Sequence, residues 1–490
     1  MSKRNYDPAS AASIFGFSKG LLHKTLAQAV AAIDSAIDPK DIELKGKGEL
    51  GNLVEKFYYD YEPNSDPHPD FPKAGVELKT TPLKLSKKDE YLIKERLVCD
   101  MIDYCAVVKC SFEDSLFYKK CLLMLIIFYL HSKGKDARDL EFVYSVLWQF
   151  KDKDLMIIKQ DYEVIIDKIK AGKADEISEG DTMYLGACRK GQKGDSLRKQ
   201  PFSEVGAPKR AFSLKCAYMR TILSFVQESG KDMATNTDIK AEPFVELVSA
   251  KDLQSHTFEE ILTARLMAFK GQDYRQIAGH FGMPVSPREK SRYARVTKRI
   301  LLKGLRNFED AEEIRKAGII AKTIRVNIDG SINESMSFEN INYNEVFEND
   351  EWTESRWYEI VTSRFMFVVF AEVPKPASGW EDENRYVLDN VVFWTMPKND
   401  MAEAEAYWQN IRSNVLADTL QDDNNTFWKM SDGKDFHVRP KAQKGKDRYY
   451  IPISGEEVPR KCYWFDGKYV AAILRKAYGK EWSNKFVGKQ

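Results

Sequence analysis

The amino-acid sequence predicts a mixed α/β protein of two domains, from its length, its interleaved hydrophobic patterns and a pattern that repeats between its halves. The chain has 490 residues, which is long for one hydrophobic core and typical of two domains. Helical periodicity alternates with short apolar runs, as in proteins that combine helices and strands in one core. Hydrophobic residues make up 43% and charged residues 30%, a composition typical of folded globular proteins.

The first half alternates helix and strand patterns. Residues 21–37 have helical periodicity, and a loop with four prolines, residues 62–72, leads into a strand-like segment at residues 75–83. The longest apolar run, residues 122–130, is far below the ~20 residues that span a bilayer, so it predicts a buried central strand. Residues 161–171 return to helical periodicity. We therefore expect a central mixed sheet flanked by helices.

The second half repeats this alternation. Residues 258–281 and 402–417 have helical patterns, and the apolar run at residues 365–373 predicts another buried strand. Between the halves, residues 230–250 start with polar side chains, contain Pro243 and have no sustained period, which is typical of a linker. The predicted parts are a first domain, a linker and a second domain, at residues 1–229, 230–250 and 251–490.

Short motifs recur in the same order in the two halves. Residues 74–80 (AGVELKT) align with residues 317–323 (AGIIAKT). Residues 112–115 (FEDS) align with residues 352–355 (WTES), each a short distance before an apolar strand. Because several weak matches keep their order over much of the chain, they predict a diverged internal duplication.

Composition argues against several classes of protein. The net charge is +1, so a nucleic-acid partner must be recognised through local basic patches. Seven cysteines without a CxxC pair predict neither a disulfide framework nor a zinc site. The start of the chain lacks the apolar stretch of a secretory signal, so we expect a cytoplasmic protein without a membrane segment. Residues 186–191 lack the Lys-Ser/Thr that follows a phosphate loop, so no nucleotide cofactor is expected.

One segment of the first half combines two acids and a lysine. Asp70 is followed after six residues by Glu77-x-Lys79. In a strand, residues i and i+2 point to the same face, so Glu77 and Lys79 project together, and Asp70 in the preceding loop can converge on them. Two carboxylates at short range suit Mg²⁺, and a nearby ammonium can orient an attacking water. The segment predicts in-line hydrolysis of a phosphodiester, although the same spacing also occurs in solvated edge strands.

A further carboxylate supports this interpretation. Glu55 closes the segment Lys47-Gly-Glu-Leu-Gly51-Asn-Leu-Val-Glu55, which predicts a helix entered through glycines. A carboxylate on that helix can face the same pocket and hold a metal-bound water or a ligand in place.

The two motifs together, KGxxGxxxE and DFxxxGVELKTxP, resemble those of the MutH family of endonucleases. The family includes a mismatch-repair nicking enzyme and type II restriction enzymes that cut GATC, and the restriction branch carries two MutH-like folds in one chain. The resemblance implies a duplicated restriction-endonuclease-like (PD-(D/E)xK) fold and Mg²⁺-dependent cleavage of double-stranded DNA at GATC. It places Glu55, Asp70, Glu77 and Lys79 at the catalytic positions, with Asp70 and Glu77 as metal ligands.

The alignment of the two halves predicts that the second half has lost the catalytic residues. Its four matching positions carry Leu301, Glu313, Ile320 and Lys322. An aliphatic side chain cannot bind Mg²⁺, so this half is expected to be catalytically inactive and to bind DNA as an allosteric or dimerising module.

Residues for DNA contact follow from the resemblance. Residues 436–442 (FHVRPKA) resemble the family's R-P-K stretch, whereas residues 188–190 (CRK) depart from it at the cysteine. Basic side chains in both places are expected to contact phosphates or bases. The predicted DNA-binding residues are Lys47, Arg189, Lys190, Arg439 and Lys441.

Two alternatives remain open. The first is a methyl-directed nicking enzyme of mismatch repair, although nicking needs only one such fold. The second is a non-catalytic DNA-binding regulator, because residues 274–283 and the basic stretch after them resemble a helix-turn-helix. The basic residues of that stretch are Lys290, Arg292, Arg295, Lys298 and Arg299. Because one active site cuts one strand per event, the restriction hypothesis predicts self-association on DNA.

Overall fold

The computed structural model describes most of the chain. The described ranges are 5–34, 49–63, 66–86, 89–191, 197–237, 247–302, 311–376, 378–380, 383–421, 425–440 and 448–486. The predicted DNA-binding residues Lys47 and Lys441 lie outside them. The chain divides into a first unit and a second unit, made of Met1–Ser255 with Glu312–Gly318 and of His256–Ala311 with Ile319–Gln490.

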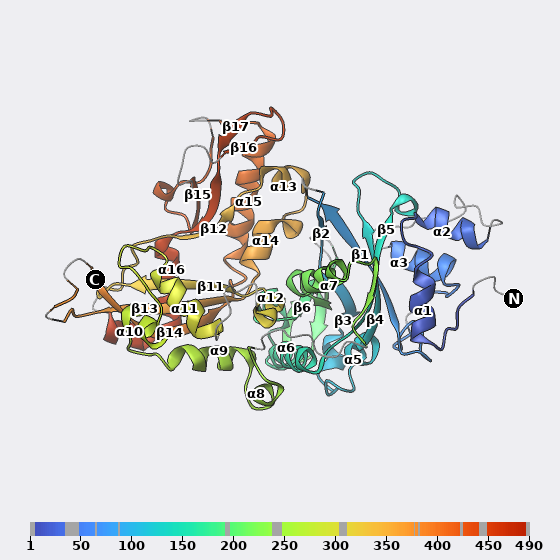
Figure 1. The fold of residues 1–490 in the computed structure, drawn as a ribbon, viewed down its shortest axis with the longest axis horizontal. Coiled ribbons are helices and arrows are strands. Elements are labelled where there is room, and N and C mark those ends of the chain that lie inside the picture. The colour runs from blue at the N-terminus through green and yellow to red at the C-terminus, as the bar shows by residue number, and fades with distance from the viewer. Residues whose placement is uncertain are drawn as a thin grey trace. The chain divides into compact units, whose positions relative to one another are not determined.

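The first unit contains both helices and strands along its whole length (Figure 1). Its elements are α1 (Ala11–Ser18), α2 (Leu26–Ile33), α3 (Glu49–Leu53), a π-helix (Val54–Tyr58), β1 (Glu77–Leu85), β2 (Tyr91–Ile93), β3 (Leu97–Met101), α4 (Tyr104–Val107), α5 (Leu116–Cys121), β4 (Leu123–Leu130), β5 (Phe142–Gln149), α6 (Asp152–Lys170), β6 (Leu185–Arg189), β7 (Arg198–Gln200), β8 (Ser203–Ala207), β9 (Arg210–Leu214), α7 (Cys216–Glu228), β10 (Met233–Thr235), α8 (Ala250–Ser255) and α12 (Glu312–Ala317).

Two sheets organise the first unit. The larger sheet has the strand order β10-β5-β4-β1-β2. Strands β1 and β4 are parallel, with Glu77 opposite Met124, and β5 is antiparallel to β4. The smaller sheet, β3-β9-β6, is antiparallel throughout. The mixed sheet confirms the predicted mixed α/β class.

The side chains of β1 alternate between the two faces of the larger sheet. Leu78 belongs to a buried core that also contains Leu125 of β4 and side chains of α1, α2 and α3. Glu77 and Lys79 therefore point to the other face. On that face, Trp148 of β5 contacts the ring of Tyr218 in α7. Glu77 and Lys79 thus share the face that packs against α7.

The second unit is built from a similar succession of elements (Figure 1). They are α9 (Phe258–Met267), α10 (Tyr274–His280), α11 (Arg292–Leu302), β11 (Ile320–Val326), β12 (Met336–Asn340), α13 (Tyr343–Glu348), α14 (Arg356–Val361), β13 (Phe365–Val373), β14 (Arg385–Trp394), α15 (Met401–Leu416), β15 (Phe436–Pro440), β16 (Arg448–Tyr450), β17 (Glu457–Pro459), β18 (Lys461–Phe465), α16 (Gly467–Tyr478) and α17 (Lys480–Lys485).

The two units share a pattern of strand pairing. In the second unit β11 is parallel to β13 and β13 is antiparallel to β14, as β1, β4 and β5 are in the first. The sheet β12-β18-β15 is antiparallel, like β3-β9-β6. Ser115 and Ser355, which end the second pair of aligned motifs, each cap the helix before the paired strand, α5 or α14. The aligned motifs therefore occupy equivalent places in the two units.

Several predicted elements agree with the structure, and one segment differs. The run at residues 365–373 is strand β13, and the run at residues 122–130 contains strand β4. Residues 230–250, predicted as a linker, include β10, which pairs in parallel with β5. Polar composition concealed this short edge strand, because only one of its sides meets the sheet.

The described part of the chain has no helix with the length and hydropathy needed to cross a membrane. All seven cysteines are free thiols, and Cys99, Cys121, Cys188 and Cys462 are buried.

Candidate active site

A tight loop brings Asp70 next to Glu77. The backbone N–H of Phe71 donates to the carbonyl oxygen of Val76 at 2.9 Å, so the chain folds back on itself immediately before β1. Gly75 has a φ of 65°, a left-handed conformation that glycine adopts without strain. The six residues between Asp70 and Glu77 therefore form a closed loop, which brings the two acids side by side.

Hydrogen bonds hold the two carboxylates together. The Asp70 N–H donates to Glu77 Oε2 at 3.2 Å, and the Leu78 N–H donates to Asp70 Oδ2 at 2.8 Å. Lys79 Nζ donates to Glu77 Oε1 at 2.6 Å. The side chain of Glu77 is only 2% exposed, so this pairing takes place away from bulk water. The structure therefore brings together Asp70, Glu77 and Lys79, as predicted from their spacing.

A second lysine, which the sequence motifs did not reveal, lies at the same cluster. Lys120 Nζ is 3.7 Å from Glu77 Oε1. It lies on α5, just before β4, and the parallel pairing of β1 with β4 begins at Glu77. In the sequence, Lys120 was marked only by its place before the predicted central strand. Local spacing does not show that this strand, β4, pairs with β1.

Glu55 approaches the cluster from a distorted helix. It lies in the π-helix that continues α3, where the Tyr59 N–H reaches back to the Val54 carbonyl oxygen at 3.0 Å. Such π-turns often occur at functional sites. Gly51 permits the close packing of α3 on β1, because a Cβ there would meet Thr80 Oγ1 at 3.2 Å. Burial and the neighbouring Asp70 carboxylate raise the pKa of Glu55 to about 8.

The other acids of the cluster are also perturbed. Burial and the Glu77 carboxylate raise the pKa of Asp70 to about 6. Burial raises the pKa of Asp100 on β3, a carboxylate that also feels the charges of Lys120 and Lys79. Burial is the main cause of these raised pKa values, and for Glu55 and Asp70 a neighbouring carboxylate adds to it. A bound cation would favour the ionised form of such acids.

The Lys79 ammonium remains charged. Although burial disfavours its charged form, the Glu77 carboxylate beside it raises the pKa of Lys79 above its ordinary value. A lysine with a raised pKa cannot act as a base near neutral pH. It can instead donate hydrogen bonds and stabilise negative charge that develops on a bound phosphate.

No group of three or more His, Cys, Asp or Glu side chains in the described ranges is arranged to hold a metal ion. The chemistry of the donors is nevertheless that of a magnesium site, since Mg²⁺ is commonly held by one or two carboxylates together with waters and substrate phosphates.

The matching positions in the second half lack this chemistry. Ile320 starts β11 where Glu77 starts β1, and Leu301 is fully buried in α11. Lys322 Nζ donates to the carbonyl oxygen of Ser337 at 2.7 Å. Glu313, aligned with Asp70, belongs to the first unit, where its Oε1 accepts from the N–H of Leu247 at 3.2 Å. Glu313 is thus a buried structural acid and not part of a second acidic cluster.

The predicted DNA-binding residues that the structure describes lie at or near strand ends. Arg189 is exposed at the end of β6, and Lys190 follows it, with its N–H donating to the Lys209 carbonyl oxygen at 2.8 Å. Arg439 lies on β15, with its guanidinium 3.9 Å from the centre of the Trp464 ring. His437 lies two residues before Arg439 on the same face of β15. Its side chain is wholly buried and is stacked with the ring of Trp464, so it is not exposed to a ligand.

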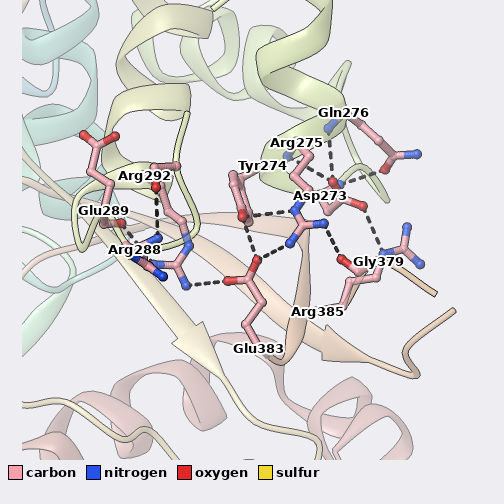
Figure 2. Close-up of polar contacts among 11 residues, drawn as sticks. Asp273, Tyr274, Arg275, Gln276, Arg288, Glu289, Arg292, Gly379, Glu383 and Arg385 are labelled. Atoms are coloured by element: carbon pink, nitrogen blue, oxygen red, sulfur yellow. Dashed lines mark hydrogen bonds and ion pairs between the residues drawn. The ribbon is translucent and has the colours of Figure 1, made fainter. Parts of the chain in front are cut away.

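The helix-turn-helix-like stretch of the second unit is held by ion pairs. Arg275 and Arg292 both point to the Glu383 carboxylate (Figure 2), with Nη2–Oε distances of 2.7 and 2.9 Å. Arg385 Nε similarly donates to Asp273 Oδ2 at 3.0 Å. Arg292, one of the residues proposed to meet phosphates, is thus neutralised within the protein and joins α11 to the loop before β14.

Comparison with known proteins shows what the region around this site is similar to. Residues 59–161 match the sequence profile of the family described as DNA mismatch repair enzyme MutH. The match spans β1, the Asp70 loop and Lys120. The resemblance to the MutH family, inferred above from the two motifs, is confirmed.

Individual relatives refine this class. The chain is 29% identical over 476 residues to the type II restriction enzyme Sau3AI of Staphylococcus aureus, covering 92% of both proteins. It is 27% identical over 206 residues to the DNA mismatch repair protein MutH of Shewanella sp. strain MR-7, covering 41% of this chain and 89% of that protein. MutH of Shewanella putrefaciens is 28% identical over 204 residues, with similar coverage. The similarity to the restriction enzyme therefore extends over both units.

Proposed function

We propose that this protein is a type II restriction endonuclease that hydrolyses both strands of duplex DNA at GATC and requires Mg²⁺. The observation that carries the proposal is the buried cluster of Asp70, Glu77 and Lys79, with Glu55 beside it. The cluster lies in the region that matches the MutH family, in a chain similar along nearly its whole length to a type II restriction enzyme.

The side chains of the cluster fit Mg²⁺. Asp70 and Glu77 supply hard oxygen ligands. Burial and the neighbouring Glu77 carboxylate raise the pKa of Asp70, and a divalent cation would offset both effects. When bound, Mg²⁺ supplies Lewis-acid stabilisation of a phosphate oxygen and lowers the pKa of a bound water.

The protein's own groups then have separate tasks. Lys79, held by Glu77, presents a charged donor to the scissile phosphate. Lys120 adds a second positive charge beside the Glu77 carboxylate. Glu55, with a pKa near 8, holds or accepts a proton beside the attacking water.

The proposed division of labour follows the two units. The first unit carries the four catalytic residues, and the second is a diverged copy of the same PD-(D/E)xK fold without them, which binds DNA through Arg439 and Lys441. The shared strand pairing supports this proposal. One active site per chain cuts one strand at a time, so two chains are expected to associate on DNA.

Cleavage of unmethylated plasmid tests the function. The full-length protein with Mg²⁺ is expected to give linear products whose ends map to GATC, and chelation of the metal is expected to stop the reaction. Glu77→Ala removes a metal ligand and the partner of Lys79, so cleavage is expected to fall by about a thousandfold or more while DNA binding remains. Glu90→Ala, at an exposed acid before β2, is the control. Cleavage at GATC by Glu77→Ala would overturn the site assignment.

The same assay separates the alternative functions. The 41% of the chain that matches MutH proteins favours a nicking enzyme as the second candidate. Accumulation of open circles without linear plasmid would support nicking. Metal-independent binding without cleavage of any duplex would support a DNA-binding regulator.

A further inference from the structure

The hairpin formed by β7 and β8 exposes an unusual amount of apolar side chain. Leu197, Phe202 and Val205 are 59%, 59% and 56% exposed. Arg198 pairs with Ala207 across the hairpin, and Phe202 lies in the two-residue turn at its tip. Contiguous apolar patches on a protein surface mark interaction sites.

The hairpin is firmly anchored to the body of the first unit. Gln200 is 1% exposed, and its side chain accepts from the Ala174 N–H at 2.9 Å and donates to the Val205 carbonyl oxygen at 2.7 Å. Gly172 lies under the tip, where a Cβ would meet the Phe202 carbonyl oxygen at 2.5 Å. The backbone is therefore fixed, and the side chain of Phe202 is held out into solvent.

Basic residues lie along the hairpin and at its base. The basic residues on the hairpin and at its base are Arg189, Lys190, Arg198, Lys199 and Lys209. Within the described ranges, no ion pair neutralises any of these five side chains. Glu204 is the only acid between residues 197 and 209. An apolar tip with unpaired cations on either side suits a polyanion that also has flat apolar surfaces, and duplex DNA has both.

The base of the hairpin is close along the strands to Asp100, an acid that feels the charges of Lys120 and Lys79. Lys190 and Lys209, at the base of the hairpin, are joined by a backbone hydrogen bond of 2.8 Å. Along β9, two positions beyond Arg210, Phe212 lies opposite Asp100 of β3. Asp100 is the carboxylate whose pKa responds to Lys120. The register of β6, β9 and β3 therefore places the base of the hairpin two residues along β9 from the position paired with Asp100.

We propose that the hairpin Leu197–Ala207 is a DNA-contacting element of the first unit, in which Phe202 packs against bases or sugars in a groove beside the cleavage site and the surrounding lysines and arginines contact phosphates. The proposal rests on the proposed function, since it takes duplex DNA as the substrate. The two kinds of contact respond differently to salt. A phosphate contact releases counterions, whereas an apolar or stacking contact does not.

Equilibrium binding of a short duplex with one GATC site tests the proposal. Full-length Glu77→Ala protein, which is expected to bind without cutting, serves as the parent, and the dissociation constant is measured over a range of salt concentrations. Phe202→Ala is expected to weaken binding about tenfold without changing the dependence on salt. Arg198→Ala and Lys199→Ala are each expected to weaken binding and to reduce the salt exponent by about 0.9.

Two matched control substitutions lie outside the hairpin, at residues on or next to strands of the larger sheet. Leu92→Ala, at a side chain that is 40% exposed on β2, controls for Phe202→Ala, and Lys135→Ala, after β4, controls for the basic residues. Neither control is expected to change affinity by more than about twofold. Unchanged thermal unfolding of all variants shows that the fold is retained, as expected for exposed side chains.

Two results would overturn the proposal. One is affinity of the three hairpin variants within about twofold of the parent. The other is a Phe202→Ala variant that lowers the salt exponent as a lysine substitution does. Failure of the proposed function would be distinguishable, because the protein with an intact Glu77 would then not cut plasmid at GATC at all.

Discussion

Individual residues of the candidate active site are held in an environment that disfavours their charged forms. Glu55 and Asp70 have raised pKa values because both are withdrawn from water and lie near other carboxylates. At a pH between the unfolded and the folded pKa of each group, the folded protein therefore keeps a proton that the unfolded chain has lost. Without metal, the stabilising effect of each bound proton is present below the unfolded pKa and is lost as the pH rises through the folded pKa.

Glu55→Gln is expected to remove part of this pH dependence. The pKa of Glu55 rises from 4.5 to about 8 on folding, so in wild-type protein the free energy of unfolding falls across that window. The neutral amide has no proton to lose, and the variant is expected to be more stable than wild type by about 2 kcal/mol near pH 8. Urea unfolding at low and high pH in a chelator measures this difference. Glu90→Gln is the exposed control, and equal pH dependence in wild type and Glu55→Gln would contradict the prediction.

At the scale of elements, α3 and its π-helix set the position of Glu55 relative to β1. The closest approach is at Gly51, where the absence of a side chain leaves room for Thr80. The glycine motif thus serves close helix-to-strand packing, which places a carboxylate one helical turn later against the cluster.

Gly51→Val is expected to impair catalysis more than stability. Its branched side chain pushes α3 away from β1, and a shift of about 1 Å in a catalytic group lowers the rate of cleavage by about a hundredfold. Overpacking is expected to cost about 1–3 kcal/mol in the free energy of unfolding. Plasmid cleavage and urea unfolding measure the two effects. Gly16→Val provides the matched control, because that helical glycine has open space around it, and wild-type cleavage by Gly51→Val would refute this role.

For the whole molecule, the units do not follow a single division of the chain. Residues 256–311 belong to the second unit, and residues 312–318 then return to the first. Lys316, in this returning segment, has a side chain that is 3% exposed, and its Nζ lies 2.7 Å from Asp154 Oδ2. Tyr218 donates to the same carboxylate oxygen at 2.8 Å. The returning helix therefore completes a buried network in the first unit.

Lys316→Met is expected to lower the free energy of unfolding by about 3–5 kcal/mol, because Asp154 is left as an unpaired buried charge. Adding Asp154→Asn to the Lys316→Met chain is expected to recover part of the lost free energy of unfolding. The neutral amide of the asparagine carries no charge that a buried cation must balance. Lys159→Met, which breaks an exposed pair with Glu113, is expected to cost less than about 1 kcal/mol. Urea unfolding of the full-length variants compares them. Equal losses in the free energy of unfolding for Lys316→Met and Lys159→Met would show that the buried ion pair stabilises the fold no more than the exposed pair does.

Local sequence was sufficient for the parts of the site that are close together in the chain. Asp70, Glu77 and Lys79 were predicted to converge, because a closed loop and the two-residue period of a strand relate them within one segment. Glu55 was predicted from its motif, although the π-helical turn that holds it was not. Lys120 was missed because it approaches Glu77 through the pairing of β1 with β4. Asp100 was missed because it lies on a strand of the other sheet, and neither relation is encoded by neighbours in the sequence.

The sequence by itself determined the mixed α/β class, the central strands and the catalytic motif, since hydrophobic periodicity and short spacings are local properties of the chain. Only the tertiary structure decided which distant segments meet. It brought Lys120 to Glu77, returned Glu313 and Lys316 to the first unit, buried His437 and raised Phe202 on an anchored hairpin. These outcomes depend on burial and on strand register across many residues, and the free energy of such contacts is fixed by the whole fold and not by any single segment.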